Sequence, residues 1–387
     1  MMTEDNARES IRVSKMGTEA ALPAIDRVYP SLPSMMRKYD RHARKNCFKG
    51  STQQEFTEWQ RRTRLLLHDL LGLDRMEPCE ASPVFEETKV LENGIRREHL
   101  RIQSEPGVWM PMYILIPADA DENTRLFICP PGHNGDGKYS VAGLAEYAMI
   151  RQAVGRYHYD YGLQLARAGY TVVCPDCRGF GERREERTAA ECGDTALKGD
   201  CYRLAHMGEP LGIPVIGMLV YDLMRCIDYL ISRAETSSHR EYDTGNISCL
   251  GFSGGGMQTL WLAALDPRIQ LAVISGYMYG YRDSLLLLNE NCACNYVPNL
   301  SLYLDMGDIA SLIAPRPLLI QSCSQDRLNG PRGMQNVTEQ MVIIQKAYGL
   351  LHADDALLHE ICAGPHQWHG ENIEQEIRTL CSAAGNK

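Results

Sequence analysis

The sequence predicts an α/β fold in three layers, with a mostly parallel sheet between two layers of helices. The first observation is that short apolar runs alternate with helical segments from Arg125 onward, which is the pattern of a parallel sheet. The second is an apolar run that breaks into Gly251-Phe252-Ser253-Gly254-Gly255 and resumes with helical character from Met257. A strand, a sharp glycine-flanked turn and a helix therefore follow one another around Ser253.

Length and composition limit the classes of protein that this chain can represent. A chain of 387 residues can bury a large core, as one big domain or one domain with an appendage. A formal net charge of −9 argues against a nucleic-acid partner, which would require a basic face. The first thirty residues hold no apolar run of signal-peptide length, and no stretch approaches the ~20 apolar residues of a membrane helix. We therefore expect a cytoplasmic protein without a membrane partner.

The 14 cysteines fit the same compartment, because most of them lie in apolar runs. A reduced thiol in such a run acts as a small hydrophobic side chain. Disulfides would be expected only in a secreted chain.

The N-terminal part is expected to cover and extend the sheet. Residues 1–52 form an arm whose basic run is either a solvated surface or a contact with a partner subunit, which is compatible with a homo-oligomer. Amphipathic spacing predicts a helix from Gln53 to Leu71, ended by Gly72. Alternating patterns separated by turn residues then predict half-buried antiparallel strands, near Val84–Leu91, Arg96–Ile102 and Val108–Ile116.

The alternating part is expected to form the main domain, residues 53–382, followed by a short tail, 383–387. A polar loop is predicted from residue 184 to about 207, and residues 277–304 read as a lid-like insertion with leucines for an apolar cap. The predicted strands are Leu126–Cys129, Tyr170–Cys174, Ile247–Leu250, Leu271–Ser275, Leu318–Ser322 and Leu357–Cys362. The predicted helices are Tyr159–Ala168, Pro214–Arg233, Met257–Leu265, Val337–Tyr348 and Ile373–Leu380.

The turn around Ser253 has the context of a nucleophile elbow. Glycines on both sides leave room for a strained turn that holds the serine hydroxyl above the sheet edge. The following helix directs its N-terminal amides to the place where an attacked carbonyl would develop negative charge. The plain alternative is a glycine-rich turn that happens to contain a serine, and the flanking strand and helix favour the functional interpretation.

A serine nucleophile needs a base, and the base needs an orienting acid. Reactive groups collect at the carboxyl ends of parallel strands, and these ends supply Asp326, four residues past Ser322, and His366, four residues past Cys362. The order serine, aspartate, histidine is the one that this fold requires. Asp326 could instead be a turn carboxylate beside Arg327, and His369 competes with His366 for the role of base.

Acyl transfer also needs donors for an oxyanion. The backbone N–H of Gly254 directly follows the serine and is the first candidate. A second donor is expected from the loop after Cys129, through the main chain of His133 or Asn134. Taken alone, that loop could equally be a glycine and asparagine turn.

Three motifs together resemble one known group of enzymes. They are the Ser253 turn, Asp176-Cys177-Arg178-Gly179-Phe180-Gly181-Glu182-Arg183 and Ala314-Pro315-Arg316-Pro317-Leu318. The chain resembles the α/β-hydrolases grouped with acetyl xylan esterases and dienelactone hydrolases, over about residues 53–382. The stretch Cys292-Ala293-Cys294-Asn295-Tyr296-Val297-Pro298 is similar to an insertion in bacterial members. The resemblance implies a cofactor-free carboxylic ester hydrolase, with deacetylation of sugars the best-known activity of the group.

Many such relatives are exported, and the missing export signal favours small or already imported esters as substrates. We expect no cofactor and no metal. A zinc site made by Cys292, Cys294, His366 and His369 is the alternative, but two cysteines one residue apart are poorly placed for two tetrahedral positions. Buried or lid-lining thiols are the favoured interpretation.

The sequence therefore predicts a serine ester hydrolase with Ser253 as nucleophile, His366 as base and Asp326 as orienting acid. Tyr277, Tyr279 and Trp368 are expected to line the substrate pocket. One alternative is a serine peptidase of the prolyl-oligopeptidase kind, although the chain has no room for a propeller-sized N-terminal domain. The other is a catalytically silent ligand-binding protein on the same fold.

Overall fold

The computed structural model describes residues 28–185 and 199–385. Its centre is a nine-stranded sheet, whose strands lie between Val84 and Cys362. The strand order is β1-β2-β3-β5-β4-β6-β7-β8-β9. Pairing is antiparallel from β1 to β5 and parallel from β5 through β9. The strands are β1 (Val84–Val90), β2 (Arg96–Glu105), β3 (Val108–Ile116), β4 (Arg125–Ile128), β5 (Thr171–Pro175), β6 (Asp243–Phe252), β7 (Ile269–Ser275), β8 (Leu318–Cys323) and β9 (Leu357–Cys362). All nine predicted strands are confirmed.

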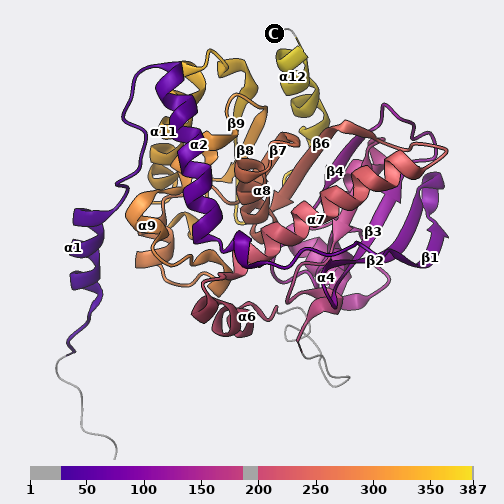
Figure 1. Cartoon of the computed structure of the whole chain (residues 1–387), viewed down its shortest axis with the longest axis horizontal. Helices are drawn as coiled ribbons and strands as arrows, with labels where there is room; N and C mark the ends of the chain where they lie inside the picture. The colour runs from indigo at the N-terminus through magenta and orange to yellow at the C-terminus, as the bar shows by residue number, and fades with distance from the viewer. Residues whose placement is uncertain (1–27, 186–198, 386–387) are drawn as a thin grey trace, which may run out of the picture.

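Helices cover both faces of this sheet, so the predicted three-layer architecture is confirmed (Figure 1). One face packs against α2, α7, α8, α10 and α11, and the other against α3, α4, α5 and α12. The main helices are α1 (Leu32–His42), α2 (Gln53–Leu70), α3 (Lys138–Val141), α4 (Ala148–Tyr157), α5 (Tyr161–Arg167), α6 (Cys201–Gly208), α7 (Val215–Thr236), α8 (Gly254–Leu265), α9 (Leu300–Tyr303), α10 (Met306–Ala310), α11 (Met334–Leu350) and α12 (Ile373–Gly385).

Helix α2 shows how the sequence sets an element. Thr52 and Glu55 form a reciprocal capping box: the Glu55 N–H donates to Thr52 Oγ1 at 3.2 Å and the Thr52 N–H to Glu55 Oε2 at 3.0 Å. The helix buries Phe56, Gln60, Thr63 and Leu67, which share one face because they are spaced by three or four residues. The left-handed Gly72, at φ 67°, follows the last turn as predicted.

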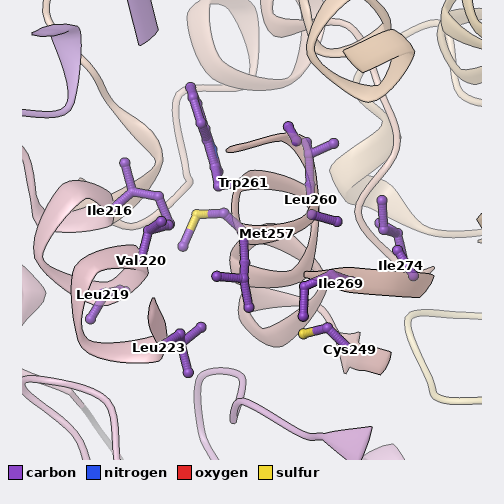
Figure 2. Packing of buried hydrophobic residues seen from close by; sticks show 14 of the residues in the cluster. Ile216, Leu219, Val220, Leu223, Cys249, Met257, Leu260, Trp261, Ile269 and Ile274 are labelled. Atoms are coloured by element: carbon purple, nitrogen blue, oxygen red, sulfur yellow. The ribbon is translucent and has the colours of Figure 1, made fainter. Parts of the chain in front are cut away.

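The packing of α7 on α8 fixes the helix that carries the serine. Figure 2 shows Ile216, Val220 and Leu223 of α7 directed toward Met257 of α8, with Ile269 of β7 beneath. All five side chains are at most 1 % exposed, so the start of α8 cannot shift without opening the core.

The motif Ala314–Leu318 has a structural role on the same helix. Arg316 donates to the backbone oxygens of Ala263 and Asp266 at the end of α8 and to that of Ile269. A cation at these carbonyls satisfies groups that the helix leaves without partners and opposes its dipole. The motif therefore holds the far end of the serine helix.

Two expectations about loops need correction. The polar loop predicted from residue 184 to about 207 contains α6, which begins at Cys201; residues 186–198 lie outside the described residues. The predicted apolar lid is also wrong in part, because Leu285 is 8 % exposed and belongs to the hydrophobic core. The insertion residues nearest the serine are polar instead, as described below.

The arm before residue 53 lies against the insertion. Arg44 forms a two-point ion pair with Asp308, with both distances 2.8 Å. The backbone N–H groups of Arg44 and Lys45 donate to the oxygens of Ser301 and Leu302. At least one residue of the predicted basic run, Arg44, therefore makes its ion pair within the same chain.

No single described helix combines the length and hydropathy needed to cross a bilayer. The segments Cys201–Leu211 and Val215–Thr236 reach that threshold only when taken together, and they meet at a bend of 94°.

A buried carboxyl group on α12, that of Glu376, should make the stability of the protein depend on pH. Burial and the neighbouring Glu360 raise the pKa of Glu376 from its ordinary 4.5 to about 7. A carboxyl group whose pKa is raised by folding favours the folded state below its unfolded pKa, and this contribution is lost as the pH rises through the folded pKa. The wild type should therefore lose stability between about pH 4.5 and about pH 7 relative to Glu376→Gln.

Thermal unfolding of both proteins across this pH range measures the difference. The expected gap in melting temperature is a few degrees, growing toward high pH in favour of the variant. Parallel curves for the two proteins would contradict the assignment.

Candidate active site

Ser253 occupies a strained turn between β6 and α8. Its φ of 57° and ψ of −120° lie in a region that L side chains rarely adopt. Its N–H donates to the Ser275 oxygen at 2.9 Å, which ties the turn to β7. The strain lifts the side chain above the carboxyl edge of the parallel strands.

The flanking glycines are required by close backbone approach. A Cβ at Gly251 would lie 2.2 Å from the backbone of Gly255, and a Cβ at Gly255 would lie 2.3 Å from the oxygen of Pro130. A Cβ at Gly254 would lie 2.7 Å from Nδ1 of His133. The elbow and the loop after β4 are therefore packed against each other, as a shared oxyanion site requires.

The predicted base and acid meet at the same edge. Nδ1 of His366 lies 2.5 Å from Oδ2 of Asp326, whose side chain is 1 % exposed. Oδ1 of Asp326 accepts from the Leu328 N–H at 2.8 Å, so one carboxylate both caps a turn and orients the imidazole. Arg327 pairs with Glu290 instead, at 2.7 Å.

Two contacts fix the imidazole of His366 beside the elbow. Its ring packs on Phe252, the residue before the serine, with 4.5 Å between ring centroids. Its Cε1 approaches Gly276 so closely that a Cβ there would lie 3.2 Å away. With Nδ1 bound to Asp326, Nε2 is the nitrogen left for a proton transfer.

His369 lies outside this arrangement. Its backbone oxygen accepts from the Gln321 amide at 2.8 Å, and its Nδ1 lies 3.8 Å from Glu371. It does not line the cavity that contains Ser253, whereas His366 does.

One cavity of about 790 Å³ contains the serine, the acid, the base and the expected oxyanion donors. The N–H of Gly254 has no acceptor within the described part of the chain, and neither has that of His133. The cavity is lined by His133, Asn134, Arg156, Tyr157, Tyr159, Ser253, Gly254, Tyr277, Tyr279, Glu290, Asn291, Cys292, Asn295, Gln325, Asp326, Arg327, Leu328, Pro365, His366 and Gln367.

The pocket expectations have a mixed outcome. Tyr277 and Tyr279 line the cavity, with 5.1 Å between their ring centroids. Trp368 does not line it: its ring is 1 % exposed, packs on Tyr161 and donates from Nε1 to Gln164 at 3.0 Å. The expectation for Trp368 was wrong because nearness to His366 in sequence does not fix the side of the chain on which a ring packs.

Tyr159 lines the cavity but was not predicted as a site residue from the sequence. Its hydroxyl donates to the His133 oxygen and interacts with Ser253. Burial raises the pKa of Tyr159 well above its ordinary value of 10, so the group remains a protonated donor. The only sequence signal was its position at the start of a predicted helix, which says nothing of chemistry.

The motif Asp176–Arg183 supports the loop that carries His133. Asp176 is fully buried and accepts from the N–H of Lys138 at 2.8 Å and from its Nζ at 2.7 Å. Arg178 forms a two-point pair with Asp222, at 3.0 and 2.9 Å. Paired buried charges of this kind position a loop, because breaking one leaves the other without a partner.

A mostly parallel sheet of this order, with a serine elbow at its carboxyl edge, defines an α/β-hydrolase. A family model described as the Abhydrolase family matches residues 33–330, and the chain belongs to this family.

The chain is also similar to a hydrolase in sequence and to esterases in structure. The putative hydrolase YtaP of Bacillus subtilis (strain 168) is 28 % identical over 246 residues, which cover 62 % of this chain and 73 % of YtaP. A putative acetyl xylan esterase from Bacteroides fragilis NCTC 9343 superposes with a TM-score of 0.69 at 19 % identity, covering 87 % of this chain and 83 % of the other. A glucuronoyl esterase from Solibacter usitatus gives 0.60 at 14 % identity, covering 94 % and 99 %. At these identities the two structures establish the shared fold.

Proposed function

We propose that the protein is a serine carboxylic ester hydrolase that acts on short-acyl esters of polar alcohols. The observation that carries the proposal is the joint position of the elbow serine and the His366–Asp326 pair in one cavity. The structural likeness to an acetyl xylan esterase and a glucuronoyl esterase supports ester chemistry.

The proposed reaction follows from the geometry. Oγ of Ser253 attacks the ester carbonyl while Nε2 of His366 takes its proton, and Asp326 stabilises the imidazolium through Nδ1–H. The N–H groups of Gly254 and His133, or of Asn134 next to it, bind the tetrahedral oxyanion. His366 then protonates the leaving alcohol. In the second half of the reaction His366 takes a proton from a water molecule that attacks the acyl-enzyme, and it returns this proton to Oγ of Ser253 as the acid is released.

The substrate class follows from the lining of the cavity. Arg156, Glu290 and Arg327 lie on its walls, together with the amide side chains of Asn291 and Gln325. Such groups suit an alcohol with several hydroxyls, since each wall group can exchange its water for a substrate hydrogen bond. A long alkyl chain would cover the same charges without replacing that hydration.

The expected result with nitrophenyl esters is a kcat/KM that peaks from acetyl to butyryl and falls by about tenfold or more at octanoyl. Acetylated sugars should be turned over at least as well as simple acetyl esters, and peptide amides negligibly. A preference for octanoyl esters would contradict the short-acyl assignment. Comparable cleavage of peptides would favour the prolyl-oligopeptidase alternative.

A further inference from the structure

Four potential metal ligands converge beside the active site. They are Nε2 or Nδ1 of His133 and the sulfurs of Cys201, Cys292 and Cys294, and one donor atom from each lies within 4.8 Å of all the others. Cys201 begins α6, which lies at the lower edge of Figure 1, and Cys292 and Cys294 belong to the insertion at 277–304. His133 comes from the loop after β4, so three distant segments contribute.

Two nitrogen–sulfur distances are close to those of a tetrahedral thiolate site. Nε2 of His133 lies 3.8 Å from Sγ of Cys201 and 3.4 Å from Sγ of Cys294. Zinc bonds of about 2.3 Å to sulfur and about 2.0–2.1 Å to nitrogen imply nitrogen–sulfur edges of about 3.5 Å and sulfur–sulfur edges of about 3.8 Å. The spacing of Cys292 and Cys294 is therefore no obstacle to joint ligation, because the turn that follows Cys292 leaves both sulfurs within 4.8 Å of each other and of the other two donors.

The surroundings of the cluster suit a bound cation. Cys201 and Cys294 are 0 % exposed, and Phe180 packs edge-on against the His133 ring. The side-chain amide of Asn295 directs Nδ2 toward Cys294 Sγ at 3.6 Å, while its oxygen accepts from the Tyr277 hydroxyl at 2.8 Å. An N–H donor oriented at a ligand sulfur is the usual outer partner of a metal thiolate.

We propose that His133, Cys201, Cys292 and Cys294 bind one zinc ion in a closed tetrahedral site. Three thiolates with one imidazole are a zinc set, because soft sulfur donors in tetrahedral geometry select zinc over magnesium, calcium or manganese. All four positions are filled by the chain, so no position is open for a substrate and the role of the ion is structural.

The ion would connect the catalytic loop to the insertion. The Nδ1 side of the His133 ring faces Gly254, where a Cβ would lie 2.7 Å away. Fixing this ring through Nε2 therefore fixes the loop that packs on the elbow. His133 is in this sense a positioning residue, and the site stands whether or not the protein hydrolyses esters.

Metal content of the full-length protein tests the proposal. The protein is expressed with added zinc, purified without chelator and analysed by elemental mass spectrometry. About one zinc per chain is expected for the wild type and less than about a tenth for Cys201→Ala and Cys294→Ala. Cys226→Ala is the matched control, because Cys226 is also a 0 % exposed helical cysteine but lies in the core on α7. It should retain the full amount.

A second measurement does not depend on how the variants fold. Wild-type protein stripped of metal and titrated with Co²⁺ should develop thiolate-to-cobalt charge transfer and the intense visible bands of tetrahedral cobalt, and zinc should abolish them.

Three results would overturn the proposal. They are zinc in equal amount in the wild type and Cys201→Ala, a weak octahedral cobalt spectrum, and iron or a disulfide among the three cysteines of the protein as purified. None of these readouts involves ester hydrolysis, so the zinc site and the proposed activity can fail separately.

Discussion

Replacing Ser253 with alanine should lower kcat/KM for acetyl esters by about 10⁴-fold or more, because it removes the hydroxyl on which the proposed acyl-enzyme forms. The variant should fold normally, since alanine removes one oxygen atom and keeps the backbone of the elbow. A fluorophosphonate probe should label the wild type at Ser253 and leave the variant unlabelled.

Ser275→Ala is the matched control for this change. Ser275 is 1 % exposed at the end of the neighbouring strand, and its hydroxyl has no hydrogen-bond partner among the described residues. Its loss should leave both labelling and turnover close to wild type. A Ser253→Ala protein that remains active, with the probe attached elsewhere, would refute the nucleophile assignment.

His366→Ala should be almost as damaging as the serine change. The three groups act as a unit, so losing the base leaves the serine hydroxyl without a proton acceptor and costs about 10⁴-fold or more. Steady-state kinetics should show the loss in kcat, with KM much less affected, because the imidazole acts in the transition state.

His369→Ala provides the comparison three residues along the same segment. His369 bonds Gln321 through its backbone oxygen, which the substitution retains, and it does not line the cavity. A loss of less than about tenfold is expected. If the two variants exchanged their phenotypes, the base would be His369 and the 2.5 Å contact of His366 with Asp326 would be structural.

The sequence predicts the fold and the site best where a local pattern is compatible with few structures. Ser253, Asp326 and His366 follow the carboxyl ends of β6, β8 and β9, and in a parallel sheet these ends share one edge. The sheet itself could be predicted because apolar strand segments alternate with helical segments along the chain. The three lie in one cavity in the structure. Their catalytic roles remain predictions for the variants above.

Side-chain direction and long-range contact could not be predicted in the same way. Trp368 is next but one to His366, yet its ring is buried in the hydrophobic core, where it packs on Tyr161 and donates to Gln164. Cys201 was predicted to lie in a polar loop. No local sequence pattern indicates that it lies close to Cys294, which follows 93 residues later (294 − 201). Contacts of this kind depend on how whole segments pack.

The backbone of Ser253 has a consequence for how such a chain can change over generations. A side chain held at φ 57° and ψ −120° costs on the order of 1–3 kcal/mol, which glycine would not incur. Selection for stability alone would therefore replace this serine with glycine, and only selection for the hydroxyl opposes that drift. A descendant freed from its substrate is expected to lose its nucleophile early and to become the more stable protein for it.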